Sequence, residues 1–260
     1  MVRILQGPGH GFVQRQNGTN STGIVIVPKG SLVFPMQYFP SGNTANTQNF
    51  ALYSTNGGLS WAATDLTPTN TLAGKPCYAQ EGCIVELDDG TWEYMSKYGR
   101  FDDQNFDSAY AGDASDDARY ECRLFFRTRD FKTWTFDGYH PSKSVRSQGS
   151  CLWLGEKVKA ANGGQSLYAS CFSTWGSYAN SQRRGGLKLF FGRDTSSEGG
   201  QPGITWDRGE IEIRHEHTKA CSYNSMAMLD DFTLGITFEA CGHIYFRKVD
   251  VRPFLKSSGE

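Results

Sequence analysis

A tight polar turn that ends in a tryptophan occurs three times in this chain, and no other feature constrains the fold as strongly. The copies are Ser54–Trp61 (STNGGLSW), Thr128–Trp134 (TRDFKTW) and Arg193–Trp206, the last of which contains an insertion. Serine, asparagine and aspartate side chains hydrogen-bond their own backbone in such turns, and glycine accepts a positive φ. Apolar, β-prone residues precede each copy, so each turn is predicted to join two strands. We expect the tryptophan of the first turn to bury its ring.

The three tryptophans are evenly spaced along the chain. Trp61 and Trp134 are 73 residues apart, and Trp134 and Trp206 are 72 residues apart. An even period that carries the same turn indicates a repeat architecture. The period exceeds the roughly 40–50 residues that are usual for a propeller blade, so insertions are expected. The sequence therefore predicts an all-β fold built from repeated sheets.

The bulk properties of the chain suit one large β domain over residues 1–260. Aromatic residues make up 13% of the chain and there are 30 glycines, as expected of many short strands joined by tight turns. The formal net charge of −1 gives no reason to expect a nucleic-acid partner. No apolar run reaches the roughly 20 residues that span a bilayer, and no apolar signal segment follows Met1.

The sequence offers no pattern for a metal or an organic cofactor. The seven cysteines contain no C-x-x-C pair and are expected to be mostly buried free thiols. Residues 101–121 are rich in aspartate without calcium-loop spacing, so a solvated loop is the favoured interpretation. His215 and His217 alternate along a possible strand, lack a third ligand, and are expected at the surface.

The repeated turn resembles the S-x-D-x-G-x-x-W "Asp box" of sialidases and related β-propellers. The first copy has Asn56 in place of the aspartate, the second keeps Asp130, and the third keeps Asp194. The segments 7–11 (GPGHG) and 30–35 (GSLVFP) resemble a further run of bacterial-type sialidases. The resemblance implies a six-bladed propeller, or a version of it without the N-terminal blade. Asp boxes are structural, so they favour a fold and not a catalytic role.

Three later motifs carry the resemblance to the sialidase active site. The segment 221–229 (CSYNSMAML) resembles S-A-Y-S-S-L-x-x-L, and 234–239 (LGITFE) resembles L-G-L-L-Y-E. The segment 81–87 (EGCIVEL) resembles E-C-Q-V-V-E-L. The resemblance implies Tyr223 as the nucleophile and Glu81 as the base that activates it. Without it, Tyr223 would be an ordinary sheet aromatic, and Glu81 an exposed residue just before a strand.

Sialidases hold the substrate carboxylate with three arginines, and this chain matches them in part. Arg184 matches one of these arginines, and Glu239 matches the glutamate that orients another. Counted from Glu86, a second arginine falls at Lys97, with Arg100 three residues on as the alternative. Residues 2–5 (VRIL) lack the proline of the family's R-I-P motif, and no aspartate matches the general acid.

The sequence therefore favours an exo-α-sialidase that hydrolyses terminal sialic acid from glycoconjugates, without metal or organic cofactor. Two alternatives stay open, a catalytically inactive glycan-binding propeller or sialidase fragment, and an Asp-box glycosidase of another specificity. The expected partner is a sialylated glycan. Oligomeric state and localisation are not specified by the sequence, although a secretory route is favoured if the N-terminus is incomplete.

Overall fold

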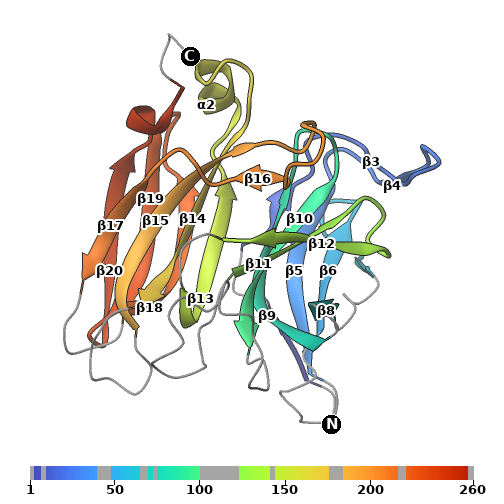
Figure 1. The fold of residues 1–260 in the computed structure, drawn as a ribbon. Helices are drawn as coiled ribbons and strands as arrows, with labels where there is room; N and C mark the ends of the chain where they lie inside the picture. The colour runs from blue at the N-terminus through green and yellow to red at the C-terminus, as the bar shows by residue number, and fades with distance from the viewer. Residues whose placement is uncertain are drawn as a thin grey trace.

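The computed structural model of this chain describes residues 3–6, 10–39, 48–64, 70–72, 75–99, 123–140, 144–175, 184–215 and 221–256. These residues form four antiparallel sheets that are arranged as the blades of a β-propeller (Figure 1). The prediction of an all-β propeller is therefore confirmed. Among the described residues no helix is long and apolar enough to cross a membrane.

The blades follow one another along the chain. Blade 1 consists of β1 (Arg3–Gln6), β5 (Leu32–Phe39), β6 (Gln48–Ser54) and β7 (Ala62–Ala63), with β2 (Phe12–Val13) paired to β5. Blade 2 consists of β9 (Lys75–Glu86), β10 (Trp92–Gly99), β11 (Arg123–Thr128) and β12 (Trp134–Tyr139), with β8 (Asn70–Leu72) paired to β9. Blade 3 consists of β13 (Ser144–Trp153), β14 (Leu167–Trp175), β15 (Arg184–Asp194), β16 (Ile204–Thr205) and β17 (Glu210–His215). Blade 4 consists of β18 (Cys221–Met228), β19 (Thr233–Ala240) and β20 (His243–Asp250).

Short elements connect these strands. A hairpin of β3 (Gly18–Thr19) and β4 (Val25–Val27) lies between β2 and β5, and α2 (Glu156–Ala161) joins β13 to β14. The 3₁₀ helix η3 (Arg252–Phe254) follows β20. Strand β13 contacts β9 on one side and β18 on the other, so these three are the inner strands of their blades.

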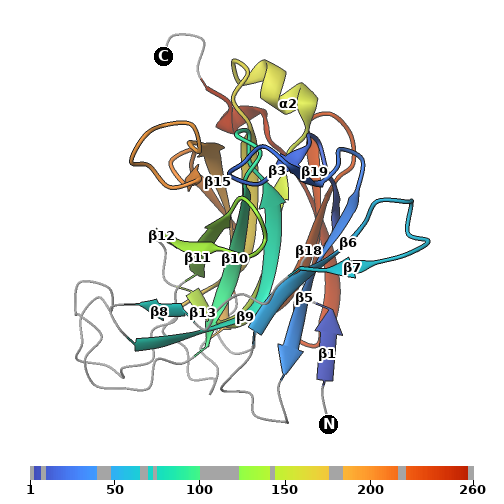
Figure 2. The same ribbon diagram turned by 90° about the vertical axis from the view of Figure 1, so that its right-hand side faces the viewer.

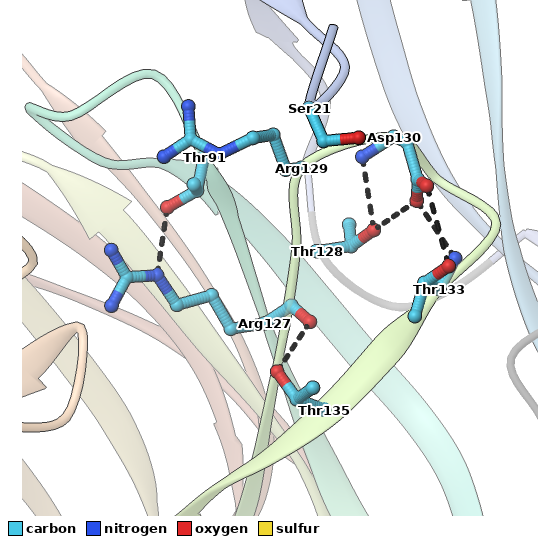
Figure 3. Close-up of a pocket in the computed structure, with 8 residues that line it drawn as sticks. All are labelled: Ser21, Thr91, Arg127, Thr128, Arg129, Asp130, Thr133 and Thr135. Carbon is cyan, nitrogen blue, oxygen red and sulfur yellow. Dashed lines mark hydrogen bonds between the residues drawn. The ribbon is translucent and has the colours of Figure 1, made fainter.

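The three predicted turns occupy equivalent places, each between the third strand of a blade and the strand that follows. In the first turn the Asn56 side-chain oxygen accepts the Ser60 N–H at 2.9 Å. In the second, Asp130 accepts the Lys132 N–H at 2.9 Å. It also accepts the Thr133 N–H at 2.7 Å (Figure 3). These bonds satisfy the backbone of the turn locally, which is why polar residues recur there.

The tryptophans of the second and third turns pack against the blade that comes before them. Trp134 is buried between blades 1 and 2, and Trp206 stacks on Phe125 of blade 2 with 6.0 Å between ring centroids. Trp61 on blade 1 is 44% exposed, touches Phe34 edge-on, and donates its indole N–H to the Gly58 carbonyl oxygen at 3.1 Å. The expectation that this first ring is buried was wrong, because the described residues contain no blade before blade 1 to cover it.

Apolar clusters fill the spaces between consecutive blades. Strand β10 shows the principle, because alternate side chains of a strand point to opposite faces. Trp92 and Tyr94 pack towards blade 1, while Met95 packs with Cys151 of blade 3. A third and larger cluster joins β14 and β15 to blade 4. The five cysteines whose side chains the structure describes are free, and four of them are buried, as predicted.

The two ends of the propeller differ in what they carry. In each blade, the connection between the first and second strands lies at the same end of the propeller as the connection between the third and fourth strands. The Asp-box turns and α2 therefore lie together at this end. Figure 2 places the start of β1 at the opposite end from α2. Each inner strand therefore runs from that opposite end towards the Asp-box end.

Candidate active site

Most of the predicted site residues that the structure describes lie at the end of the propeller opposite the Asp boxes. Tyr223 is near the start of an inner strand, Arg184 begins a third strand, and Lys97 and Glu239 lie near the ends of second strands. Because neighbouring strands are antiparallel, these positions share one end. The fold therefore gathers residues from three blades that are up to about 140 positions apart in the sequence.

Tyr223 stands on a β-bulge of β18. The register of β18 with β19 shifts between Cys221 and Asn224, so that Ser222 and Tyr223 together oppose one residue, Glu239. Bulges of this kind redirect a side chain and are common beside active sites. Tyr223 is 39% exposed, whereas Cys221 and Asn224, the residues on either side of the bulge, are buried.

Glu239 lies directly across this bulge. Its side chain is half-buried, and Oε2 accepts a hydrogen bond from the Ser222 hydroxyl at 3.3 Å. Its neighbour across the other side of β19 is Ile244. The structure thus brings Tyr223 and Glu239, which the sequence places a hairpin apart, to adjacent positions of the same blade.

Glu81 lies within β9 and not before it, which corrects the expectation that it precedes the strand. The strand starts six residues earlier, at Lys75, and a second bulge sets Glu81 and Gly82 against Ser96. Glu81 has a φ of 43°, an unfavourable value for a residue with a side chain. Gly82 is required here, because a Cβ would lie 2.0 Å from the buried Tyr94 ring.

The strand pairing of the backbone gives the positions of the basic residues that are predicted to bind the substrate carboxylate. Lys97 pairs with Gln80 of β9, next to Glu81, and with Arg123 of β11. Arg184 opens β15 opposite Trp175, where the register shifts once more. Arg100 lies outside the described residues, as do residues 101–121 and His217.

The inner strand β13 separates the two predicted catalytic residues. It lies between β9, which carries Glu81, and β18, which carries Tyr223. The Ser150 hydroxyl of β13 donates to the Asn224 side-chain oxygen of β18. Glu81 and Tyr223 are therefore on inner strands that flank the same central strand.

Sequence reasoning assigned no site role to Arg123, which is fully buried at the start of β11, opposite Lys97. Its guanidinium carbon lies 5.0 Å from the centre of the Phe172 ring. Burial, with a smaller contribution from this positive charge, lowers the pKa of His140 to about 3. The burial of Arg123 could not be predicted from the sequence around it, because the aromatic ring that covers it belongs to another blade.

A pocket of about 390 Å³ lies at the other end, beside the second Asp box (Figure 3). Its lining is rich in hydroxyl groups and includes Arg127 and Arg129. Both guanidinium groups contact the Asp89 carboxylate, at 2.5 and 3.2 Å. None of the predicted site residues lines it, so we assign it to the Asp-box turns. No group of three or more metal-ligating side chains occurs in the described part of the chain.

Known proteins that are similar to this chain in sequence or in fold include sialidases. No protein-family model matches the chain. A sialidase of Bacteroides fragilis is 24% identical over 259 residues, which is 97% of this chain and 37% of that protein. A Hadza microbial sialidase has the same fold, with a TM-score of 0.63 and 18% identity over 96% of this chain and 38% of that one.

The chain resembles sialidases. It spans less than two-fifths of the length of the sialidases that it matches. The fold of this sialidase-like chain is also shared by an α-L-arabinanase of Penicillium chrysogenum, with a TM-score of 0.52 and 11% identity. That match covers 92% of the sialidase-like chain and 68% of the arabinanase. The propeller itself therefore does not decide the substrate.

Proposed function

We propose that this sialidase-like chain carries the nucleophile of an exo-α-sialidase, which releases terminal sialic acid from glycoconjugates. The observation that supports the proposal most is the position of Tyr223. It is exposed on a bulge of an inner strand, faces Glu239, and lies at the end away from the Asp boxes.

Tyrosine suits this substrate for an electrostatic reason. Sialic acid carries a carboxylate on the anomeric carbon, so a carboxylate nucleophile would approach against a like charge. A tyrosine hydroxyl is neutral until a neighbouring base takes its proton, and sialidases are known for a tyrosine nucleophile. In this proposal Tyr223 attacks the anomeric carbon as the glycosidic bond breaks and the aglycone leaves on its oxygen, and Glu81 accepts the tyrosine proton. The sialyl-tyrosine intermediate is then hydrolysed with retention of configuration.

The basic residues at the same end suit the substrate carboxylate. Arg184, and Lys97 or Arg100, would bind it, and Glu239 would orient a basic partner. A lysine is not equivalent to an arginine at a bidentate site, so we expect a weaker clamp at Lys97. The general acid is not assigned to any residue of this chain.

The experiment that tests this proposal measures which of two fluorogenic glycosides the purified chain hydrolyses. A fluorogenic aryl α-sialoside is the right first substrate, because its phenolate leaving group depends little on a general acid. We expect release of the fluorophore from this sialoside and none from the matching α-L-arabinofuranoside. Saturable sialoside binding without release would favour a glycan-binding propeller. Release from the arabinofuranoside alone would favour a glycosidase of another specificity.

A further inference from the structure

The bulge that contains Tyr223 is held by buried hydrogen bonds on both of its sides. Before the bulge, the Ser173 hydroxyl of β14 donates to the Cys221 carbonyl oxygen at 2.5 Å. After the bulge, the Ser150 hydroxyl of β13 donates to the Asn224 side-chain oxygen. Both serines are fully buried, and both belong to blade 3, whereas the bulge belongs to blade 4.

These bonds fix the two residues that border the bulge and leave Tyr223 between them. Cys221 and Asn224 are buried at 0% and 4% exposure, so neither bond competes with water. Ser222 is tied across the sheet to Glu239, which leaves Tyr223 as the bulge residue that points outward. A third contact, from the Gln148 side chain to the Asn224 carbonyl oxygen at 3.5 Å, lies on the same side as Ser150.

We propose that Ser150 and Ser173 are positioning residues that clamp the Tyr223 bulge from the neighbouring blade. This inference rests on the proposed role of Tyr223 as the nucleophile. A bulge supplies one unpaired residue and therefore a degree of freedom that an ordinary strand lacks. Fixing both of its ends from a rigid neighbouring sheet holds the phenol oxygen in one place.

Removal of either hydroxyl should affect the chemical step more than substrate binding. Ser150→Ala leaves the buried Asn224 oxygen without its donor, and Ser173→Ala does the same to the Cys221 carbonyl. A misplacement of the nucleophile by about 1 Å costs on the order of 100-fold in rate. We therefore expect kcat on the aryl sialoside to fall about 10- to 100-fold, with KM nearly unchanged.

The chain offers a matched control in Ser170. It lies on the same strand as Ser173 and is equally buried, but its hydroxyl contacts Met95 Sδ at 3.2 Å, away from blade 4. Ser170→Ala should leave kcat unchanged. Ser173→Thr keeps the hydroxyl and should restore most of the rate. Thermal unfolding and near-UV circular dichroism of each variant identify any loss of the native fold.

A second readout separates this proposal from the proposed function. Nitration of Tyr223 by tetranitromethane, followed by mass spectrometry of its peptide, reports on the phenol in the absence of any turnover. We expect faster nitration of Tyr223 in Ser150→Ala and Ser173→Ala, and an unchanged rate in Ser170→Ala. If the unmodified chain hydrolyses no sialoside but these nitration rates differ, the clamp stands and the proposed function fails. Equal kcat values and equal nitration rates in all three alanine variants would overturn the clamp.

Discussion

At the scale of single residues, Glu81 and Tyr223 share an unusual backbone setting. Both lie on inner strands where two residues oppose one, at the same end of the propeller. Both residues could be singled out from the sequence, because each belongs to a short motif of consecutive residues. It could not predict the bulges, because a bulge is a property of two paired strands. For the same reason Glu81 was expected before its strand and is found inside it.

The backbone of Glu81 gives a prediction about stability. A non-glycine residue at a φ of 43° is strained by about 1–3 kcal/mol, and glycine relieves this strain. We compare Glu81→Gly with Glu81→Ala, since both remove the carboxylate. Glu81→Gly should have the higher free energy of unfolding, by about 1 kcal/mol, in urea denaturation. Both variants should lose sialoside turnover.

The comparison also tests whether the strained conformation is real in solution. If Glu81→Ala is as stable as Glu81→Gly, the residue does not occupy the left-handed region. Retention of turnover in both variants would remove Glu81 from the proposed mechanism.

At the scale of elements, the contacts between blades include a pair of acidic side chains, of which Glu93 is buried and Asp137 is half-buried. The side chain of Glu93 on β10 is hydrogen-bonded to Asp137 on β12, and Asp137 Oδ2 accepts the Gly203 N–H of blade 3 at 2.6 Å. A Cβ on Gly203 would lie 2.2 Å from Glu93 Oε2, so both carboxyl groups converge there. This convergence could not be predicted from the sequence, since Asp137 and Gly203 are 66 residues apart.

Burial raises the pKa of Glu93 well above the ordinary 4.5, and the charge of Asp137 raises it further, while Arg127 opposes the shift. Folded protein therefore holds a proton that the unfolded chain releases above about pH 4.5. The contribution of this pair to stability is complete at lower pH and is lost as the pH rises through the raised pKa. The slope approaches about 1.4 kcal/mol per pH unit.

Glu93→Gln should remove this dependence, because the amide stays neutral and still donates to Asp137. We expect the free energy of unfolding of the variant, relative to the unmodified chain, to increase from pH 5 to pH 8. Glu210→Gln, at a side chain that is 47% exposed, is the matched control and should show no such trend. Parallel pH profiles for all three proteins would contradict a proton held at Glu93.

At the scale of the whole molecule, the four described blades follow one another, and apolar clusters cover the faces between consecutive blades. Blade 4 packs Met226, Ile236 and Phe238 against blade 3. Its other face exposes Ile244 and Phe246, at 71% and 57%. The period of the Asp boxes predicted repeated blades correctly. The exposure of Trp61 could not be predicted, because it depends on what lies beyond blade 1.

The two faces of blade 4 should therefore respond differently to the same change. Phe238→Ala empties a buried site and should cost about 3–5 kcal/mol of the free energy of unfolding. Phe246→Ala should change it by less than about 0.5 kcal/mol, because that ring is mostly exposed. Chemical denaturation of the two variants at low protein concentration measures both. A cost at Phe246 as large as that at Phe238 would show that this face is covered in solution.

The most direct test of the central claim is a rapid-quench experiment with an aryl α-sialoside, followed by mass spectrometry of the peptide that contains Tyr223. We predict one sialyl group on that peptide during turnover. We also predict neither adduct nor turnover in Tyr223→Phe, which should still bind the sialoside. Unchanged turnover by Tyr223→Phe, with no adduct on the native peptide, would contradict the assignment of Tyr223 as the nucleophile.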